Sequence, residues 1–239
     1  MSTSPPTPRP YEYGVPVADL ITRYRATYSG AVYDVLDELG YPHQALATDV
    51  KPVAQHWVLA GPAFTVKGIP DPTGDENLRA RRIELFTAMR AAGVPVIDVR
   101  DCSADTQAAH YGEMNATVGE ACGVIGAVVD GGSRDTRFLL DRDFPVFCRY
   151  LTPVEAVGRW SYYDWQRTVA LRGAITATVS VSPGDFIMGD VDGVVVIPRT
   201  VVVDVLERTE ALIAQEKISR AEFRSGEDPV AVYRRHGRL

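Results

Sequence analysis

The chain has 239 residues, 46% of them hydrophobic and 23% charged, so it can bury one large core and is not disordered over most of its length. Its net charge of −6 and sequence pI near 5.3 argue against a nucleic-acid-binding surface, which normally needs a basic stripe. The three cysteines, Cys102, Cys122 and Cys148, are odd in number and widely spaced, which favours reduced thiols in a cytoplasm over a disulfide framework or a zinc knuckle.

Residues 1–15 are predicted to form a flexible leader, because the first part of this segment is rich in proline and has little apolar surface. No stretch of the chain is apolar over the length of a membrane span, and the N-terminus lacks the apolar core of a signal peptide. We therefore expect no membrane partner and a single domain over residues 16–239.

Helix-like and strand-like segments alternate through this domain. Ser29 is predicted to cap a helix whose apolar positions recur at spacings of three and four, and Gly40 is predicted to end it. Strands are predicted at 58–66, 94–99, 124–129, 146–149, 175–181 and 194–197, and further helices at 76–89, 114–122, 136–140 and 200–223. This alternation predicts an α/β domain with substantial parallel sheet.

Residues 123–135 are the most informative segment. An apolar run at 124–129 is typical of a strand covered on both faces, and Asp130 to Gly132 are predicted to break it in a tight turn. Arg134 and Asp135 then stand at the carboxyl end of the strand, before a short helix. Glu113, with twenty residues between it and Arg134, lies at a second junction of strand and helix, so we expect both junctions to share one pocket.

Carboxylates at such a pocket, with no matching set of His or Cys ligands, suit Mg²⁺ or Mn²⁺ better than zinc. The alternative is that Arg134 and Asp135 form a solvated pair at the start of a helix. His110 lies near the same junction, but an isolated histidine near the end of a strand is more often a structural residue than a ligand. The sequence contains no phosphate-binding or dinucleotide-binding glycine loop, and no His and Asp partners are recognised that would make Ser133 a nucleophile.

The spacing of Glu113 from the Arg134–Asp135 pair resembles the pattern of the RraA-like family. This family includes class II pyruvate aldolases acting on 4-hydroxy-4-methyl-2-oxoglutarate and 4-carboxy-4-hydroxy-2-oxoadipate, as well as inhibitors of ribonuclease E. The resemblance spans residues 27–227 and includes blocks at 33–40, 60–66, 144–147, 183–185 and 190–198.

The resemblance implies a swivelling β/β/α sandwich, like that of phosphohistidine domains, assembled as a homotrimer or homohexamer. It also implies a metal-dependent lyase that cleaves a carbon–carbon bond of a 2-oxo acid through a pyruvate enolate, by retro-aldol cleavage or by oxaloacetate decarboxylation. In this scheme Asp135 holds the metal, and Arg134 stabilises the enolate oxygen. Gly112, Met114 and Asn115 hold the substrate, chiefly through backbone amides, and Glu113 positions or deprotonates a water.

Glu216 lies within an apolar stripe of the last long helix, where its carboxylate needs a partner such as Lys217, Arg220 or a neighbouring chain. The resemblance implies that Glu216 enters the active site of the adjacent subunit. Oligomerisation would then complete the catalytic site.

Two features depart from the family pattern. Glu113 stands where the aldolases usually carry Asp, and the acid that they carry two to four positions after the Arg-Asp pair is absent here, the next being Asp141. The aromatic segment Trp160 to Trp165 also fits poorly, and it either sets a different specificity or packs in the core. The alternatives are therefore an enzyme of this fold with another substrate, and a regulatory protein that acts by protein contact. The sequence leaves open the physiological substrate, the preferred metal and the choice between trimer and hexamer.

Overall fold

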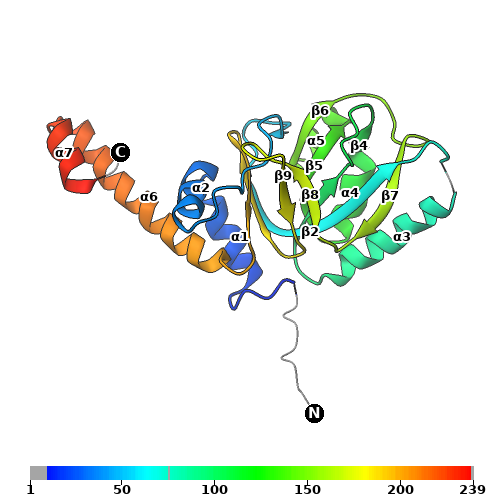
Figure 1. The fold of residues 1–239 in the computed structure, drawn as a ribbon, viewed down its shortest axis with the longest axis horizontal. Helices are drawn as coiled ribbons and strands as arrows, with labels where there is room; N and C mark the ends of the chain where they lie inside the picture. Colours follow the sequence, from blue (N-terminus) through cyan, green and yellow to red (C-terminus); the bar gives the residue numbers. More distant parts are fainter. Residues whose placement is uncertain (1–9, 75, 238–239) are drawn as a thin grey trace, which may run out of the picture.

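The computed structural model describes residues 10–74 and 76–237. In chain order its elements are α1 (Val17–Arg25), α2 (Ser29–Glu38), β1 (Lys51–Pro52), β2 (Leu59–Pro70), α3 (Glu76–Ala91), β3 (Val96–Asp101), β4 (Ala109–Tyr111), α4 (Glu113–Ala121), β5 (Val124–Ser133), α5 (Thr136–Asp141), β6 (Val146–Leu151), β7 (Trp160–Trp165), β8 (Val169–Arg172), β9 (Thr178–Val181), β10 (Phe186–Asp190), β11 (Gly193–Ile197), α6 (Val202–Arg224) and α7 (Pro229–His236). Figure 1 shows their arrangement.

The main sheet has the strand order β1-β6-β5-β3-β2-β10-β11, with β4 added beside β5 and β7 beside β2. Strands β2, β3, β5 and β6 are parallel neighbours, and β4 also runs parallel to β5, which confirms the prediction of a substantial parallel sheet. Strand β2 is long enough to serve two regions. Its first residues pair with β10, and its last residues pair with β7 along the same edge.

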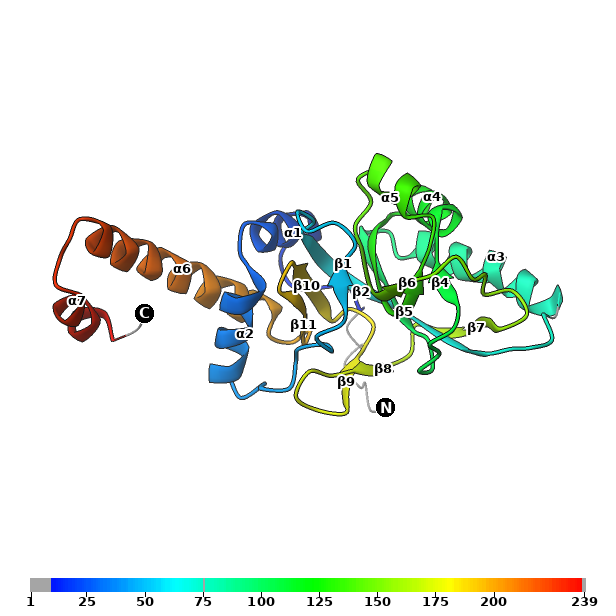
Figure 2. The same cartoon turned by 90° about the horizontal axis from the view of Figure 1, so that it is seen from above.

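The alternation of side chains along the strands builds three apolar layers. In β10, Ile187 packs into the layer between the two halves of the sheet, whereas its neighbours Phe186 and Met188 pack beneath α1, α2 and α6. In β2, Phe64 and Val66 face the opposite way, under α3 and α4. Figures 1 and 2 show these two groups of helices at opposite ends of the molecule. The result is two stacked sheet regions, each covered by helices on its outer face.

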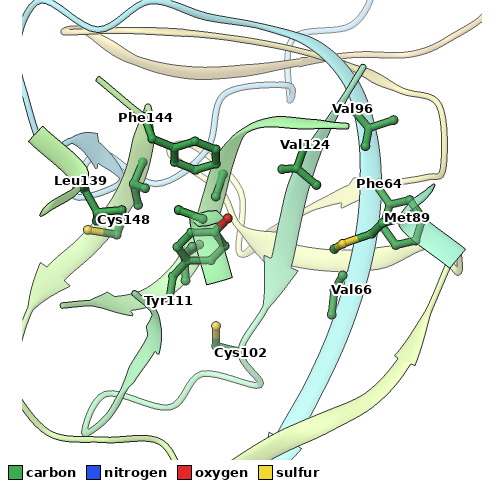
Figure 3. Close-up of a cluster of buried hydrophobic side chains, with 14 of the residues drawn as sticks. Phe64, Val66, Met89, Val96, Cys102, Tyr111, Val124, Leu139, Phe144 and Cys148 are labelled. Carbon is green, nitrogen blue, oxygen red and sulfur yellow. The ribbon is translucent and has the colours of Figure 1, made fainter. Parts of the chain in front are cut away.

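The core beneath α3, α4 and α5 supports the carboxyl ends of β4 and β5. Figure 3 shows Tyr111 of β4 beside Phe144, and the two rings stack with centroids 6.2 Å apart. Val124 of β5, Leu139 of α5 and Met89 of α3 complete the same cluster. The segments that follow β4 and β5 therefore start from a rigid base.

One prediction about β5 is wrong. Asp130, Gly131 and Gly132 do not end the strand in a turn, because β5 continues to Ser133 and pairs with both β4 and β6 there. The glycines permit close packing instead. A Cβ on Gly131 would lie 2.3 Å from Nδ1 of His110, and one on Gly132 would lie 2.4 Å from the ring of Tyr150.

The predicted strand at 175–181 is also wrong in its extent. Only Thr178–Val181 of the first predicted strand is extended, and it pairs with β8. The turn at Pro183 and Gly184 leads into β10, which is the strand that pairs with β11. The sequence patterns did not predict strands β1, β4, β7, β8 and β10 or helices α1 and α7.

The two ends of the described chain differ in their contacts. Residues 1–9 of the predicted leader lie outside the described residues, whereas Tyr13 donates a hydrogen bond of 2.6 Å to the carbonyl of Gly184 and Tyr11 packs against the core. At the other end, α6 extends away from the sheet and α7 folds back on its tip (Figure 1). Among the described helices, none combines the length and the apolar character needed to cross a membrane.

Candidate active site

Arg134 and Asp135 directly follow the last residue of β5. The backbone N–H of Arg134 donates to the carbonyl of Tyr111 in β4 at 3.0 Å, which fixes the start of this turn. Asp135 has a φ of 59°, a left-handed conformation that Asp tolerates better than most residues, and its carbonyl accepts from the N–H of Phe138 to begin α5. The side chains of Arg134 and Asp135 are each about one-third exposed.

The junction between β4 and α4 lies against this turn. The N–H of Glu113 donates to Oδ2 of Asp135 at 3.2 Å, although the two residues are 22 positions apart. Gly112 allows this contact, because a Cβ there would lie 2.5 Å from the same carboxylate oxygen and 3.2 Å from Cγ of Arg134. The structure thus brings the two predicted junctions together.

Both junctions open into a cavity of about 310 Å³. Its floor is formed by Gly112, Asn115 and the Arg134–Asp135 pair, with Met114 exposed at its edge. Trp160 and Tyr162 of β7, with Phe86 and Arg82 of α3, line another part of it. The guanidinium of Arg82 lies 5.6 Å from the ring centroid of Tyr162. The cavity therefore combines two cationic side chains, aromatic surface and carboxylates.

The Arg134 guanidinium lies between two carboxylates. Its Nε is 3.5 Å from Oδ2 of Asp135, and its Nη2 is 3.6 Å from Oε1 of Glu155, which follows β6. Glu155 is held in place by its backbone, since it forms a parallel bridge with Ala109 of β4. These contacts leave Arg134 donors available to an anionic oxygen in the cavity.

A fully buried ion pair lies behind the cavity. Arg100 and Asp98 of β3 form a hydrogen bond of 2.7 Å between Nη2 and Oδ2, and the Arg100 guanidinium lies 4.5 Å from the ring centroid of Tyr111. Nη1 of Arg100 also donates to the hydroxyl of Tyr162 at 3.2 Å, and that hydroxyl donates to Oδ1 of Asn115 at 2.8 Å. The buried pair therefore orients two cavity side chains.

His110 has a structural role, as expected for an isolated histidine. Its Nδ1 accepts from the N–H of Gly132 at 3.0 Å, so Nε2 carries the proton and donates to Oδ2 of Asp105 at 2.9 Å. Burial lowers the pKa of His110, while the neighbouring Asp105 acts in the opposite direction. Nδ1 therefore fixes β4 against β5, and Nε2 fixes β4 against the loop that precedes it, so neither ring nitrogen is available to a ligand.

The predicted site residues are placed unequally around the cavity. Gly112, Met114, Asn115, Arg134 and Asp135 line it. The N–H of Asn115 is engaged with the carbonyl of Gly112 at 3.0 Å, so this residue faces the cavity with its side chain rather than with a free amide.

Glu113 and Glu216 make other contacts within the described chain. The Glu113 carboxylate accepts from the Thr117 hydroxyl along α4, and Glu113 does not line the cavity. Glu216 accepts from the Tyr28 hydroxyl and from Arg220, one of the partners expected for it. It lies on α6, at the opposite end of the molecule from α3, α4 and β7 (Figure 1).

Sequence reasoning missed Glu155, Arg82 and the cavity role of Tyr162. Arg82 lies within the predicted helix 76–89, and Glu155 lies in a segment without a motif. The one signal available was the aromatic segment 160–165, which both packs in the core and lines the cavity: Trp160 and Tyr162 are each at most 5% exposed.

Asp135 is the residue best placed to hold a divalent cation. Its Oδ2 is engaged by Glu113, whereas its Oδ1 makes no hydrogen bond within the part of the chain that the structure describes. The described residues contain no group of three or more His, Cys, Asp or Glu side chains that could hold a metal. A single carboxylate with water and substrate oxygens fits Mg²⁺, which keeps several waters and needs only one or two protein carboxylates.

Comparisons with known proteins agree with the fold. A protein of Halalkalibacterium halodurans named "Putative 4-hydroxy-4-methyl-2-oxoglutarate aldolase" is 30% identical over 199 residues, which are 83% of this chain and 86% of that protein. A crystal structure described as that of novel cellulases from microbes associated with the gut ecosystem matches with a TM-score of 0.78 and 32% identity, over 86% of this chain and 89% of that one.

RraAS2 of Streptomyces coelicolor, described as an unusual member of the RNase ES inhibitor RraA protein family, matches with a TM-score of 0.71 and 21% identity, over 86% of this chain and 97% of that one. This likeness confirms the predicted β/β/α sandwich. Residues 29–196, which include every element from α2 to β10, match the model of the RraA-like family described as Aldolase/RraA. The chain therefore belongs to the RraA-like family, in which aldolases and RraA proteins share one fold.

Proposed function

We propose that this protein is a divalent-metal-dependent lyase that cleaves a carbon–carbon bond of a 2-oxo acid through a pyruvate enolate. The observation that carries the proposal is the contact of Glu113 N–H and Arg134 with the carboxylate of Asp135 at the floor of one cavity. The aldolase name of the Halalkalibacterium halodurans relative supports the same reaction class. The two candidate reactions are retro-aldol cleavage of a 4-hydroxy-2-oxo acid and decarboxylation of oxaloacetate.

The residues divide the chemistry between them. A cation held by Asp135, Mg²⁺ or Mn²⁺, would supply Lewis acidity at the keto and carboxylate oxygens of the substrate. Arg134 carries a permanent charge and donates to the keto oxygen, where negative charge develops as the carbon–carbon bond breaks. Asn115 and the backbone near Gly112 and Met114 hold the substrate carboxylate. Both reactions share this enolate, so one site serves both.

We also propose that the active enzyme is a homotrimer or homohexamer in which Glu216 of a neighbouring subunit completes the site. The exposed apolar side chains around the cavity support an interface there. Met114 on α4 lines the cavity, Phe138 and Leu140 lie on α5 directly after Asp135, Leu151 ends β6, and Val154 precedes the cavity residue Glu155. An apolar patch rimmed by polar residues is typical of a protein contact surface.

The test is a parallel assay of the purified protein on oxaloacetate and on 4-hydroxy-2-oxo acids, with Mg²⁺ or Mn²⁺. We expect the protein to release pyruvate and to stop doing so when EDTA is added. Arg134→Ala and Asp135→Ala should each lower turnover by about 10²-fold or more, as for removal of a preorganised charge. Rates unaffected by EDTA would overturn the metal scheme. A regulatory protein would instead show no turnover and would keep its partner affinity in both variants.

A further inference from the structure

We propose that Glu155 is the general base of the retro-aldol reaction, a role that the family resemblance implied for Glu113 and a water. This inference rests on the proposed lyase function. It concerns the proton of the 4-hydroxyl group, which must leave before or as the carbon–carbon bond breaks.

Elimination among the cavity residues points to Glu155. Of the described residues that line the cavity, the carboxylates are Asp135 and Glu155, and Asp135 is the candidate metal ligand. His110 uses both ring nitrogens within the fold, and burial raises the pKa of Tyr111 well above its usual value. The Glu113 carboxylate is bonded to Thr117 along its own helix. Among the described residues of one subunit, Glu155 alone combines access to the cavity with a carboxylate that no structural hydrogen bond engages.

The position of Glu155 also fits the role. Its Oε1 lies 3.6 Å from Nη2 of Arg134, whose Nε faces Asp135. One guanidinium therefore stands between the metal-binding carboxylate and the proposed base. A substrate whose keto oxygen accepts from Arg134 extends its C4 hydroxyl away from Asp135 and toward Glu155.

The backbone holds Glu155 in register with the floor of the cavity. The N–H of Ala109 donates to the carbonyl of Val154 at 2.9 Å, and Glu155 bridges to Ala109 in parallel. Ala109 begins β4, the strand that ends one residue before Gly112. A base attached to a sheet edge is positioned more accurately than one on a free loop.

The step balances with Glu155 as both acceptor and donor. The carboxylate takes the proton of the 4-hydroxyl, the C4–O bond becomes a carbonyl, and the electron pair of the C3–C4 bond forms the C2–C3 double bond of the enolate. After the keto product leaves, protonated Glu155 returns the proton to C3 and pyruvate forms. Decarboxylation of oxaloacetate breaks its bond without removing a hydroxyl proton, so it does not need this base.

The experiment compares Glu155→Gln with the unmodified full chain, with Mn²⁺ present, on both substrate types. We expect the retro-aldol kcat to fall about 10²-fold to 10³-fold, and the decarboxylation kcat to change by less than about threefold, because general base catalysis serves only the first reaction. The fall of the retro-aldol kcat toward acid pH should be absent from the residual activity of the variant. Glu155→Asp should recover part of the loss.

Two further measurements separate a base from a positioning residue. Glu120→Gln is the matched control, because Glu120 also pairs with an arginine, Arg142, but lies outside this cavity, and it should leave both rates unchanged. Binding of Mn²⁺ and of oxalate, measured by calorimetry, should be unchanged in Glu155→Gln. An equal fall in both reactions, no fall in either, or a loss of Mn²⁺ affinity would overturn the role of Glu155 while leaving the lyase function standing. Absence of both activities in the unmodified protein would instead overturn the lyase function.

Discussion

Gly112→Ala should disable the site without unfolding the protein. The new Cβ would lie 2.5 Å from Oδ2 of Asp135 and 3.2 Å from Cγ of Arg134. Gly112 itself has an extended backbone with a φ of −159°, so alanine is not excluded by the backbone conformation. The clash is therefore confined to the side chain that holds the metal and to its neighbour.

The size of the effect follows from this geometry. An ordinary carbon–oxygen contact is about 1 Å longer, so the Asp135 carboxylate must move by about that distance, and a displacement of about 1 Å at a reacting centre can lower turnover by about 10²-fold. The lost hydrogen bond from Glu113 and a shifted rotamer of Asp135 together reduce the free energy of unfolding by about 1–2 kcal/mol. That corresponds to a fall in Tm of about 2–4 °C per kcal/mol for a domain of this size.

The assay measures pyruvate release, Mn²⁺ affinity and Tm on the same preparations. Gly119→Ala is the matched control, because it lies on the same helix and its Cβ would meet Cβ of Val124 at 3.3 Å, in the core and away from Asp135. We expect Gly119→Ala to change Tm but to keep turnover. If Gly112→Ala kept full turnover and Mn²⁺ affinity, the assignment of Asp135 would be refuted.

Three further changes test the surroundings of the cavity. Arg100→Met should lower the free energy of unfolding in urea by about 3–5 kcal/mol, because it leaves Asp98 buried without its partner, and the double variant with Asp98→Asn should recover part of this loss. Tyr162→Phe should lower it by about 1–2 kcal/mol, since the Tyr162 hydroxyl serves both Arg100 and Asn115, and an unchanged urea midpoint would show that the two bonds do not matter. Burial lowers the pKa of His110 in the folded protein, so as the pH falls the unfolded chain takes up the proton before the folded chain does. The contribution of His110 to the free energy of unfolding should therefore be lost as the pH falls below about 6.5, the usual pKa of histidine. A urea midpoint that drops as steeply between pH 7.5 and pH 5.5 in His110→Gln as in the unmodified protein would contradict that sign.

The sequence predicted the helices and strands whose burial pattern can be read from neighbouring residues. The apolar run of β5 and the periodic helix α2 were both predicted, because burial on two faces or on one face is visible in neighbouring residues. The predicted cap is wrong: Ser29 is the first residue of α2, and its hydroxyl donates to Oδ1 of Asp190 instead of capping the helix. The Arg134–Asp135 pair was recognised from its place after such a run. The sequence also led us to expect that this junction and the Glu113 junction share one pocket, but β4, the strand that brings them together, was not predicted.

Features that depend on distant partners were not predictable from the sequence. The glycines of β5 were read as a turn because glycine favours turns, and only the position of the His110 ring shows that they permit close packing. Strand β7 depends on Gly68, where a Cβ would lie 1.7 Å from the ring of Trp160. Glu155 reaches the cavity through a bridge to Ala109, which no local pattern records.

Strand β2 also determines how the molecule unfolds. It forms one ladder with β10 over Leu59–Pro62 and others with β3 and β7 over residues 63–70, so the two halves of the molecule share a single continuous strand. Loss of either half leaves one end of β2 without its partner strand. Melting is therefore expected to be cooperative across both halves, and the amide protons of β2 should exchange with solvent only when the whole domain opens.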